Sequence, residues 1–78
     1  MSDRLTQTFA DVLELPVERL NDESSPANTP EWDSLATINL TLAVEFEFGV
    51  KLNTQEIMSI VNIGIARAVL KGKGVLAL

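Results

Sequence analysis

The chain has 78 residues, of which 46% are hydrophobic and 22% charged, so it is apolar enough to fold as one small domain. It contains no Cys and no His, which removes disulfides and a structural metal as the usual supplements to a small core, and helix packing alone must hold the fold together. The net charge of −5 disfavours nucleic acid and favours either basic protein partners or simple solubility.

Charge and hydropathy patterns bear on location and partners. Residues 1–35 contain eight acids against two arginines, whereas residues 57–78 contain three basic residues and no acid. Three basic residues are too few for a nucleic-acid patch. No apolar run approaches the roughly 18 residues of a membrane span, and "MSDRLTQTF" lacks the basic start and apolar stretch of a signal peptide. We therefore expect a cytoplasmic protein.

The first expected element is a helix near the N-terminus. Its apolar residues recur with helical spacing, at Leu5, Phe9, Val12 and Leu13. Ser2 is placed as a possible N-cap, and Pro16 ends the pattern after Leu15. The next segment, "PVERLNDESSPANTPEWD", contains all three prolines and predicts a long connection over residues 16–33. Val17 and Leu20 are expected to pin this connection to the core.

The second helix is predicted to begin at "DSL" and to run to about Phe48, where Gly49 favours a stop. At about 100° per residue its apolar side chains form two opposed stripes. One stripe contains Leu35, Ile38, Leu42 and Phe46, and the other contains Leu40, Val44 and Phe48 with Thr37 and Thr41. Either the loop and a third helix cover the second stripe, or one stripe stays partly exposed as a docking surface.

Two shorter helices complete the predicted fold. In "NTQEIMSI", Asn53 and Glu56 have the spacing of a capping box at the start of a short third helix. "NIGIARAVLKGKG" predicts a fourth helix with Asn62 as cap and Gly72 at its end, and its apolar residues are Ile63, Ala66, Val69 and Leu70. The prediction is an all-α, small four-helix bundle with a long first loop and a short third helix. It forms a single domain over residues 1–78, with a helical core over about 2–71 and a tail over 72–78.

Ser34 follows Asp33 at the predicted start of the second helix, in a chain without a usual catalytic base. A nucleophilic Ser needs an adjacent base, and the three lysines, at positions 51, 71 and 73, are far along the sequence. Paired carboxylates, a Gly-rich phosphate loop and a metal cluster are also absent from the sequence. A self-contained enzyme is therefore not expected. In purely structural terms Asp33 is an N-cap and Ser34 the first helical residue.

The segment "DSLATINLTLAVEFEFGVKL" resembles the acyl carrier proteins of the phosphopantetheine-binding family. An acidic, Pro-containing loop before it and "QEIMSI" after it extend the resemblance from the first helix through Leu70. The resemblance implies that Ser34 bears a covalent 4'-phosphopantetheine arm and that Asp33 and Leu35 complete the attachment motif. The family's Glu-x-x-Phe-Gly-Val ending of the second helix is matched by Glu45, Phe48, Gly49 and Val50.

The family resemblance implies a carrier rather than a catalyst. A separate phosphopantetheinyl transferase would modify Ser34, and acyl-loading and acyl-processing enzymes would act on thioesters held at the arm's thiol. The implied docking residues are Ile38, Leu42, Phe46 and Glu45. A monomer with no metal, no membrane span and no nucleic-acid partner is implied.

The chain departs from the fatty-acid synthesis carriers that it resembles. Those carriers are richly acidic after the Ser, whereas this chain has Ala36, Asn39 and Phe46 at such positions. The "EWDSL" context looks more like stand-alone carriers associated with polyketide, lipid-modification or aminoacyl pathways, and a secondary, polyketide-like or lipid-modifying pathway is expected. The alternatives are an aminoacyl or peptidyl carrier protein, and an unmodified helical interaction domain that binds a partner helix.

Overall fold

The computed structural model describes residues 3–75, which form four α-helices and one short 3-10 helix. The elements in chain order are α1 (Arg4–Leu13), η1 (Val17–Arg19), α2 (Ser34–Phe48), α3 (Thr54–Ser59) and α4 (Ile63–Gly72). No strand occurs between residues 3 and 75. The predicted all-α bundle with a long first connection and a short third helix is therefore confirmed. Of the predicted tail, residues 76–78 lie outside the described residues, and the extent of the domain stays a prediction.

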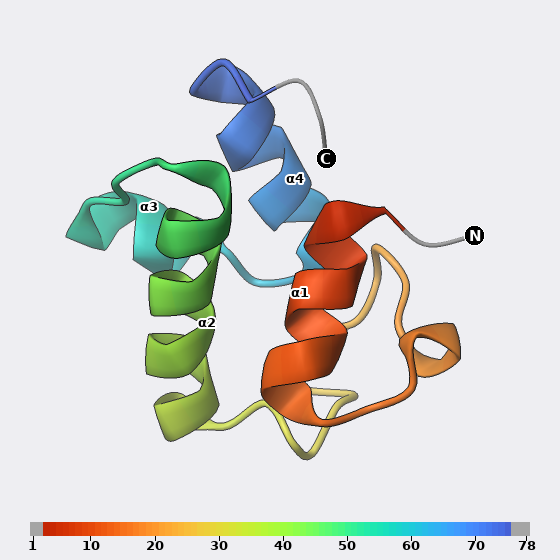
Figure 1. Ribbon diagram of the computed structural model, residues 1–78. Helices are drawn as coiled ribbons and strands as arrows, with labels where there is room; N and C mark the ends of the chain where they lie inside the picture. The colour runs from red at the N-terminus through yellow and green to blue at the C-terminus, as the bar shows by residue number, and fades with distance from the viewer. Residues whose placement is uncertain (1–2, 76–78) are drawn as a thin grey trace.

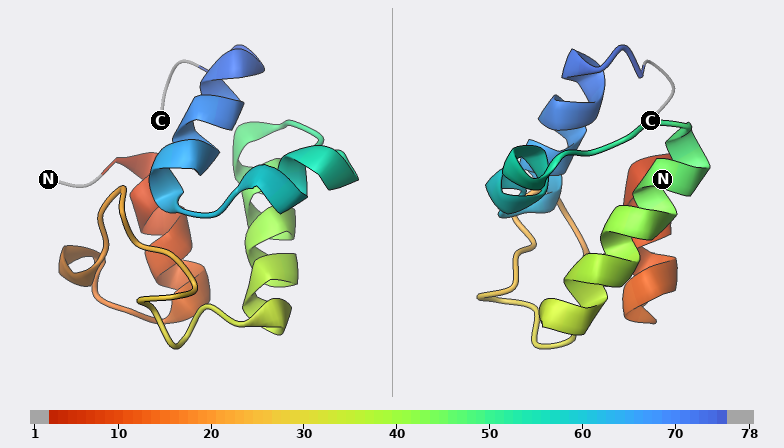
Figure 2. Two further views of the ribbon diagram at one scale, coloured as in Figure 1. Left: turned by 180° about the vertical axis from the view of Figure 1, so that it is seen from behind. Right: turned by 90° about the vertical axis from the view of Figure 1, so that its left-hand side faces the viewer.

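The helices enclose one core beneath the long connection. α1 and α2 lie side by side and run in opposite directions, and α4 lies over the end of α1 that is remote from the start of α2 (Figure 1). The short α3 crosses beside α2 on the way to α4 (Figure 2). This arrangement places the first residue of α2 at the end of the bundle opposite α4.

The ends of α1 differ from the sequence prediction. The cap is Asp3, whose carboxylate accepts a hydrogen bond from the Thr6 N–H at 2.9 Å, so the prediction of Ser2 as the cap is wrong; Ser2 lies outside the described residues. A carboxylate also interacts favourably with the positive end of the helix dipole, which a Ser does not. The helix ends at Leu13 because Glu14 adopts a left-handed conformation, with φ 57°.

The other predicted helix ends are confirmed. Asp33, Asn53 and Asn62 cap α2, α3 and α4 with their side chains, and the capping box of α3 is complete. α2 ends at Phe48, and its C-cap is Gly49, whose φ of 65° is a conformation that glycine adopts without a steric penalty. Short polar caps satisfy N–H groups that the helix itself leaves unpaired. The capping residues in the sequence were therefore sufficient to locate the starts of these three helices.

The long connection is tied to the start of α4. Leu20 is buried and Val17 packs partly against the core, as predicted. The carbonyls of Ser24 and Asp22 accept hydrogen bonds from the N–H groups of Ile63 and Gly64, at 3.2 and 2.9 Å. A Cβ at Gly64 would lie 3.2 Å from the Asp22 carbonyl oxygen, so this close approach explains a glycine inside a helix.

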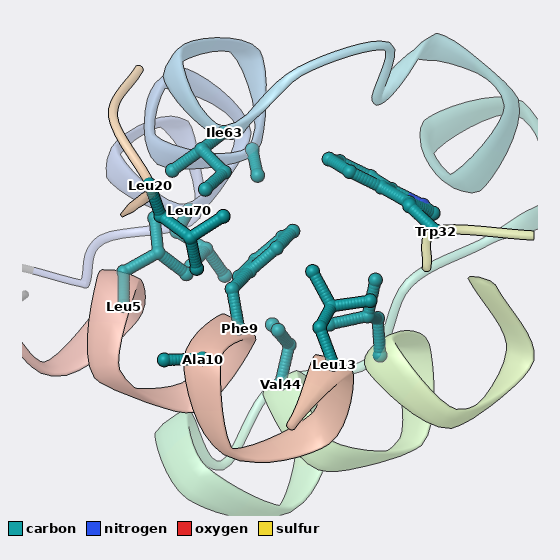
Figure 3. Close-up of a cluster of buried hydrophobic side chains, with 11 residues drawn as sticks. Leu5, Phe9, Ala10, Leu13, Leu20, Trp32, Val44, Ile63 and Leu70 are labelled. Carbon is teal, nitrogen blue, oxygen red and sulfur yellow. The ribbon is translucent and has the colours of Figure 1, made fainter. Parts of the chain in front are cut away.

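The core is a single cluster with members from α1, α2 and α4 and from the long connection. Figure 3 shows Phe9 of α1 and Trp32 of the connection pointing into the same cluster as Ile63 and Leu70 of α4. Its buried apolar members are Leu5, Phe9, Ala10, Leu13, Leu20, Trp32, Leu40, Val44, Ile63, Ala66 and Leu70. One continuous core of this kind is what a domain of this size can build.

Arg67 of α4 links α4 to the start of α1 and to the long connection, at the edge of the core. Its guanidinium donates to the carboxylate of Asp3, to the carboxylate of Asp22 at 2.8 Å, and to the hydroxyl of Thr6 at 3.5 Å. Burial raises the pKa of Asp3, but the hydrogen bonds from Thr6 and Arg67 outweigh burial, and the pKa lies below its ordinary value of 3.8. The cap of α1 is thus also an ion-pair partner of α4.

Candidate functional site

Ser34 is the first residue of α2 and is exposed to solvent. Directly before it, Asp33 accepts a hydrogen bond from the Ala36 N–H at 2.9 Å and so fixes the start of the helix. The positive end of the helix dipole and the unpaired N–H groups of the first turn favour negative charge at this position. An exposed hydroxyl here suits attachment of a phosphate-linked group, and a phosphodiester at Ser34 would lie where the helix stabilises it.

Trp32, two residues before Ser34, anchors this end of the connection in the core. Its side chain is only 4% exposed, and its ring meets Phe9 edge to face with centroids 5.3 Å apart. Its indole N–H donates to Oγ1 of Thr37 at 3.2 Å, and Thr37 Oγ1 donates to the Asp33 carbonyl oxygen at 3.0 Å. Residues on both sides of Ser34 are therefore held by the core.

Trp32 is not among the site residues predicted from the sequence. The available signal was the only Trp of the chain, placed inside an otherwise polar connection directly before the Asp-Ser-Leu motif. A large aromatic side chain in such a segment usually buries most of its surface.

The two stripes of α2 have opposite environments. Leu40 and Val44 are 4% exposed and face the core, whereas Leu35, Ile38, Leu42 and Phe46 are 67%, 58%, 60% and 90% exposed. In the right-hand view of Figure 2, no other element of residues 3–75 lies over the outward side of α2. The interpretation in which both stripes are covered, one of them by the loop and α3, is therefore wrong. We call the four exposed residues the outer stripe.

The predicted docking residues do not all lie in the same environment. Ile38, Leu42 and Phe46 belong to the outer stripe, but Glu45 is only partly exposed and its carboxylate accepts a hydrogen bond from the Leu52 N–H at 2.8 Å. Ile38 and Leu42 also line a shallow apolar groove, which Ile57 of α3 closes on the other side. Glu45 joins the end of α2 to the segment before α3, while the other three side chains face outward.

The described part of the chain offers few other sites. No group of three or more His, Cys, Asp or Glu side chains gathers among residues 3–75 in a way that could hold a metal ion. A small apolar cavity of about 20 Å³ lies in the core and is lined in part by Trp32, Thr37 and Thr41. That volume accommodates about one water molecule. Within the same residues, no helix has both the length and the apolar character needed to cross a membrane.

A small all-α domain with an exposed Ser at a capped helix start is the architecture expected of a carrier, and the comparisons with known proteins agree. The sequence model of the family described as "phosphopantetheine attachment site" matches residues 3–64. The chain is 33% identical over 61 residues to the polyketide-8 synthase acyl carrier protein 2 of Streptomyces avermitilis. The aligned residues make up 78% of this chain and 70% of the relative.

The chain therefore belongs to the phosphopantetheine-binding family of carrier proteins. Members of this family carry covalently attached 4'-phosphopantetheine and are modified by a separate transferase. The predictions of an acyl carrier protein, of its cofactor and of a carrier rather than an enzyme are confirmed.

Proposed function

We propose that Ser34 carries the 4'-phosphopantetheine arm and that the protein presents acyl intermediates to partner enzymes of a polyketide-like pathway. The supporting observation is the position of Ser34, exposed as the first residue of α2 and directly after the capping Asp33. The arm supplies a terminal thiol, and thereby a thioester linkage, to a chain that contains no Cys. Tethering the acyl group in this way raises its local concentration at each docked enzyme.

Other described serines are less suited to attachment. Ser24 is 5% exposed and its Oγ accepts a hydrogen bond from the Asn21 N–H at 3.0 Å. Ser59 ends α3, and its Oγ donates to the Glu56 carbonyl oxygen at 2.8 Å. The end of a helix is its negative pole and disfavours a phosphodiester. Ser25 lies inside the first connection and is partly buried, with no helix start beside it.

The residues around Ser34 have separate roles in this proposal. Asp33 fixes the helix start through the Ala36 N–H, and Leu35, 67% exposed, begins the outer stripe beside the attachment point. Activation of the Ser34 hydroxyl is left to the transferase, because the only acidic or basic side chain beside it in sequence is a capping carboxylate. The chain contributes a fixed, accessible hydroxyl, and the enzyme contributes its chemistry.

The pathway assignment is supported by the Streptomyces relative, whose printed name is that of a polyketide synthase acyl carrier protein. Under this proposal the partners are a phosphopantetheinyl transferase and enzymes that load and process acyl groups. We place their docking surface on Ile38, Leu42 and Phe46, with Glu45 at its edge. We also infer a cytoplasmic protein, and a monomer because the core cluster is complete within one chain.

Co-expression with a broad-specificity phosphopantetheinyl transferase, followed by intact-mass measurement, tests the proposal. The wild-type chain should gain the mass of one arm. Ser34→Ala should give the same circular dichroism spectrum and melting temperature as the wild type, and should gain nothing. Modification that persists in Ser34→Ala, or that maps to Ser24, Ser25 or Ser59, would overturn the assignment. A folded wild type that is never modified would favour an unmodified interaction domain.

A further inference from the structure

We propose that partner enzymes contact the outer stripe of α2 through an apolar surface without a basic cluster, so that burial of apolar surface, and not pairing with carboxylates, holds the complex. This inference rests on the proposed function and adds the chemistry of the partner's surface. It follows from which charged groups of α2 and α3 are free and which are already engaged.

The sequence from Ser34 to Ser59 contains three carboxylates, and each is engaged within the chain. Glu45 accepts from the Leu52 N–H at 2.8 Å. Glu47 pairs with Arg4 at 2.8 Å, and Arg4 also lies over the Phe48 ring, 4.8 Å from its centroid. These two carboxylates therefore have partners on the α1 and α3 sides of α2.

The third carboxylate, Glu56 of α3, has two partners. It accepts from the Asn53 N–H at 2.9 Å as part of the capping box, and it pairs with Lys73 at 2.8 Å. The hydrogen bond from Lys73, with that from the Asn53 backbone, lowers the pKa of Glu56 below its ordinary value. Lys73 thus directs this charge toward the end of α4. A partner that pairs with any of the three carboxylates must compete with an internal contact.

The outer stripe itself is apolar along its whole length. Leu35 lies next to the attachment residue, and Phe46, 90% exposed, lies 12 residues beyond Ser34, or about 18 Å along the helix axis. Isolated exposed apolar side chains are common on protein surfaces, but four on one side of one helix make a continuous patch. The groove lined by Ile38, Leu42 and Ile57 extends this patch toward α3.

Charge complementarity therefore identifies the occupant. A basic partner surface placed on this stripe would lose hydration without gaining a free carboxylate, which is unfavourable, whereas an apolar surface loses nothing and buries area. Buried aromatic and aliphatic anchors of the type of Phe46 usually dominate such interfaces. We assign the stripe to an apolar, uncharged patch on the partner enzyme.

Asn39 provides a test in which the two kinds of partner predict opposite signs. At 100° per residue it lies beside Leu35 and Phe46 on the outward side of α2, and it is exposed. The probe is a broad-specificity phosphopantetheinyl transferase with coenzyme A, and the measurement is kcat/KM for modification. Asn39→Glu should lower kcat/KM several-fold while Asn39→Met leaves it equal or raises it. A basic partner would reverse this order.

Two further variants separate apolar contact from charge. Phe46→Ala should lower kcat/KM by about tenfold with an unchanged melting temperature, since its side chain is 90% exposed. Glu47→Gln, the matched control on the same turn, should stay within about twofold of the wild type because its carboxylate is engaged by Arg4.

The outcomes distinguish this inference from the proposed function. A wild type that gains no arm overturns both. A wild type that is modified at Ser34, with Asn39→Glu as fast as or faster than the wild type, overturns only the apolar docking surface. Sedimentation of the wild type as a dimer that Phe46→Ala dissociates would give the stripe to a second copy of the chain and would also overturn it.

Discussion

The indole N–H of Trp32 and Oγ1 of Thr37 are joined by a hydrogen bond of 3.2 Å that spans the Asp33-Ser34-Leu35 segment. Trp32 lies at the end of the long connection, directly before the capping Asp33, and Thr37 lies in the first turn of α2. Because Trp32 also packs edge to face on Phe9, the position of Ser34 is set by α1 as well as by its own helix. The orientation of the proposed attachment site at Ser34 therefore depends on the tertiary core.

Trp32→Phe should keep the contact with Phe9 and lose the hydrogen bond to Thr37. A single hydrogen bond of this kind contributes about 0.5–1.5 kcal/mol to the free energy of unfolding, so a loss of at least that size is expected, with a further small loss for the smaller ring. Urea unfolding followed by circular dichroism measures it, since Trp32 is the only Trp and its fluorescence disappears in the variant.

A double-mutant cycle with Thr37→Val provides the control for Trp32→Phe. If the hydrogen bond couples the two residues, the losses in the double variant should fall short of the sum of the single losses by about 0.5–1.5 kcal/mol. Additive losses would show that Trp32 contributes through packing alone.

Asp3→Asn should keep the N-cap and remove the charge that pairs with Arg67. Because the folded-state pKa of Asp3 is lowered below 3.8, its ionised form stabilises the fold fully at pH values above that. The stabilisation is lost as the pH falls through the folded-state pKa. At pH 7 the variant should therefore melt below the wild type, and the difference should shrink as the pH is lowered toward 3.

The matched control for Asp3→Asn is Asp11→Asn, the same change at an exposed carboxylate of α1 whose described partner is the side-chain amide of Gln7. It should shift the melting temperature much less at pH 7. An Asp3→Asn variant whose deficit is the same at pH 3 and pH 7 would show that the ion pair with Arg67 contributes nothing measurable.

The sequence was sufficient where structure depends on neighbouring residues, and insufficient where it depends on distant ones. Asp33, Asn53 and Asn62 were identifiable as caps because a cap bonds an N–H two or three residues away. The start of α1 was misplaced by one residue because Ser2 and Asp3 are both capping types. Its end was missed because Glu14, a non-glycine, adopts the left-handed conformation.

The features beyond the reach of the sequence are those set by packing. Trp32 is buried against Phe9, which lies next to it in the core but 23 positions away in the sequence. A contact between such distant positions cannot be seen in the sequence pattern. The two stripes of α2 were correctly separated by periodicity, but which elements cover them depends on the path of the connection and of α3. Glu45 matches the family's motif, yet its bond to the Leu52 N–H becomes visible only in three dimensions.

Glu45→Ala should destabilise the fold more than Glu47→Ala. Glu45 is partly buried and accepts from the Leu52 N–H, and a hydrogen bond to a charged group contributes about 1.5–3 kcal/mol. Glu47 forms an exposed ion pair with Arg4, which is worth about 0–1 kcal/mol. Denaturant unfolding of both variants checks this order. Equal losses would mean that Glu45 is not a structural link between α2 and α3.

Leu40→Ala and Leu42→Ala make the same change on opposite stripes of α2. The first should lower thermal stability, and the second should slow modification by the transferase. Leu40 is 4% exposed, and truncating a buried Leu typically costs about 2–5 kcal/mol, a large share of the stability of so small a domain. Leu42 is 60% exposed, so its truncation creates no internal cavity and should cost much less. The melting temperature should therefore fall strongly for Leu40→Ala alone.

The functional readout of the Leu40 and Leu42 pair is the rate of modification by the phosphopantetheinyl transferase, measured well below both melting temperatures. Leu42 belongs to the outer stripe that begins beside Ser34, so Leu42→Ala should slow modification, while folded Leu40→Ala should retain most of the wild-type rate because its outer stripe remains intact. Equal thermal losses would show that both stripes are buried. An unchanged rate in Leu42→Ala would remove this residue from the surface that partners contact.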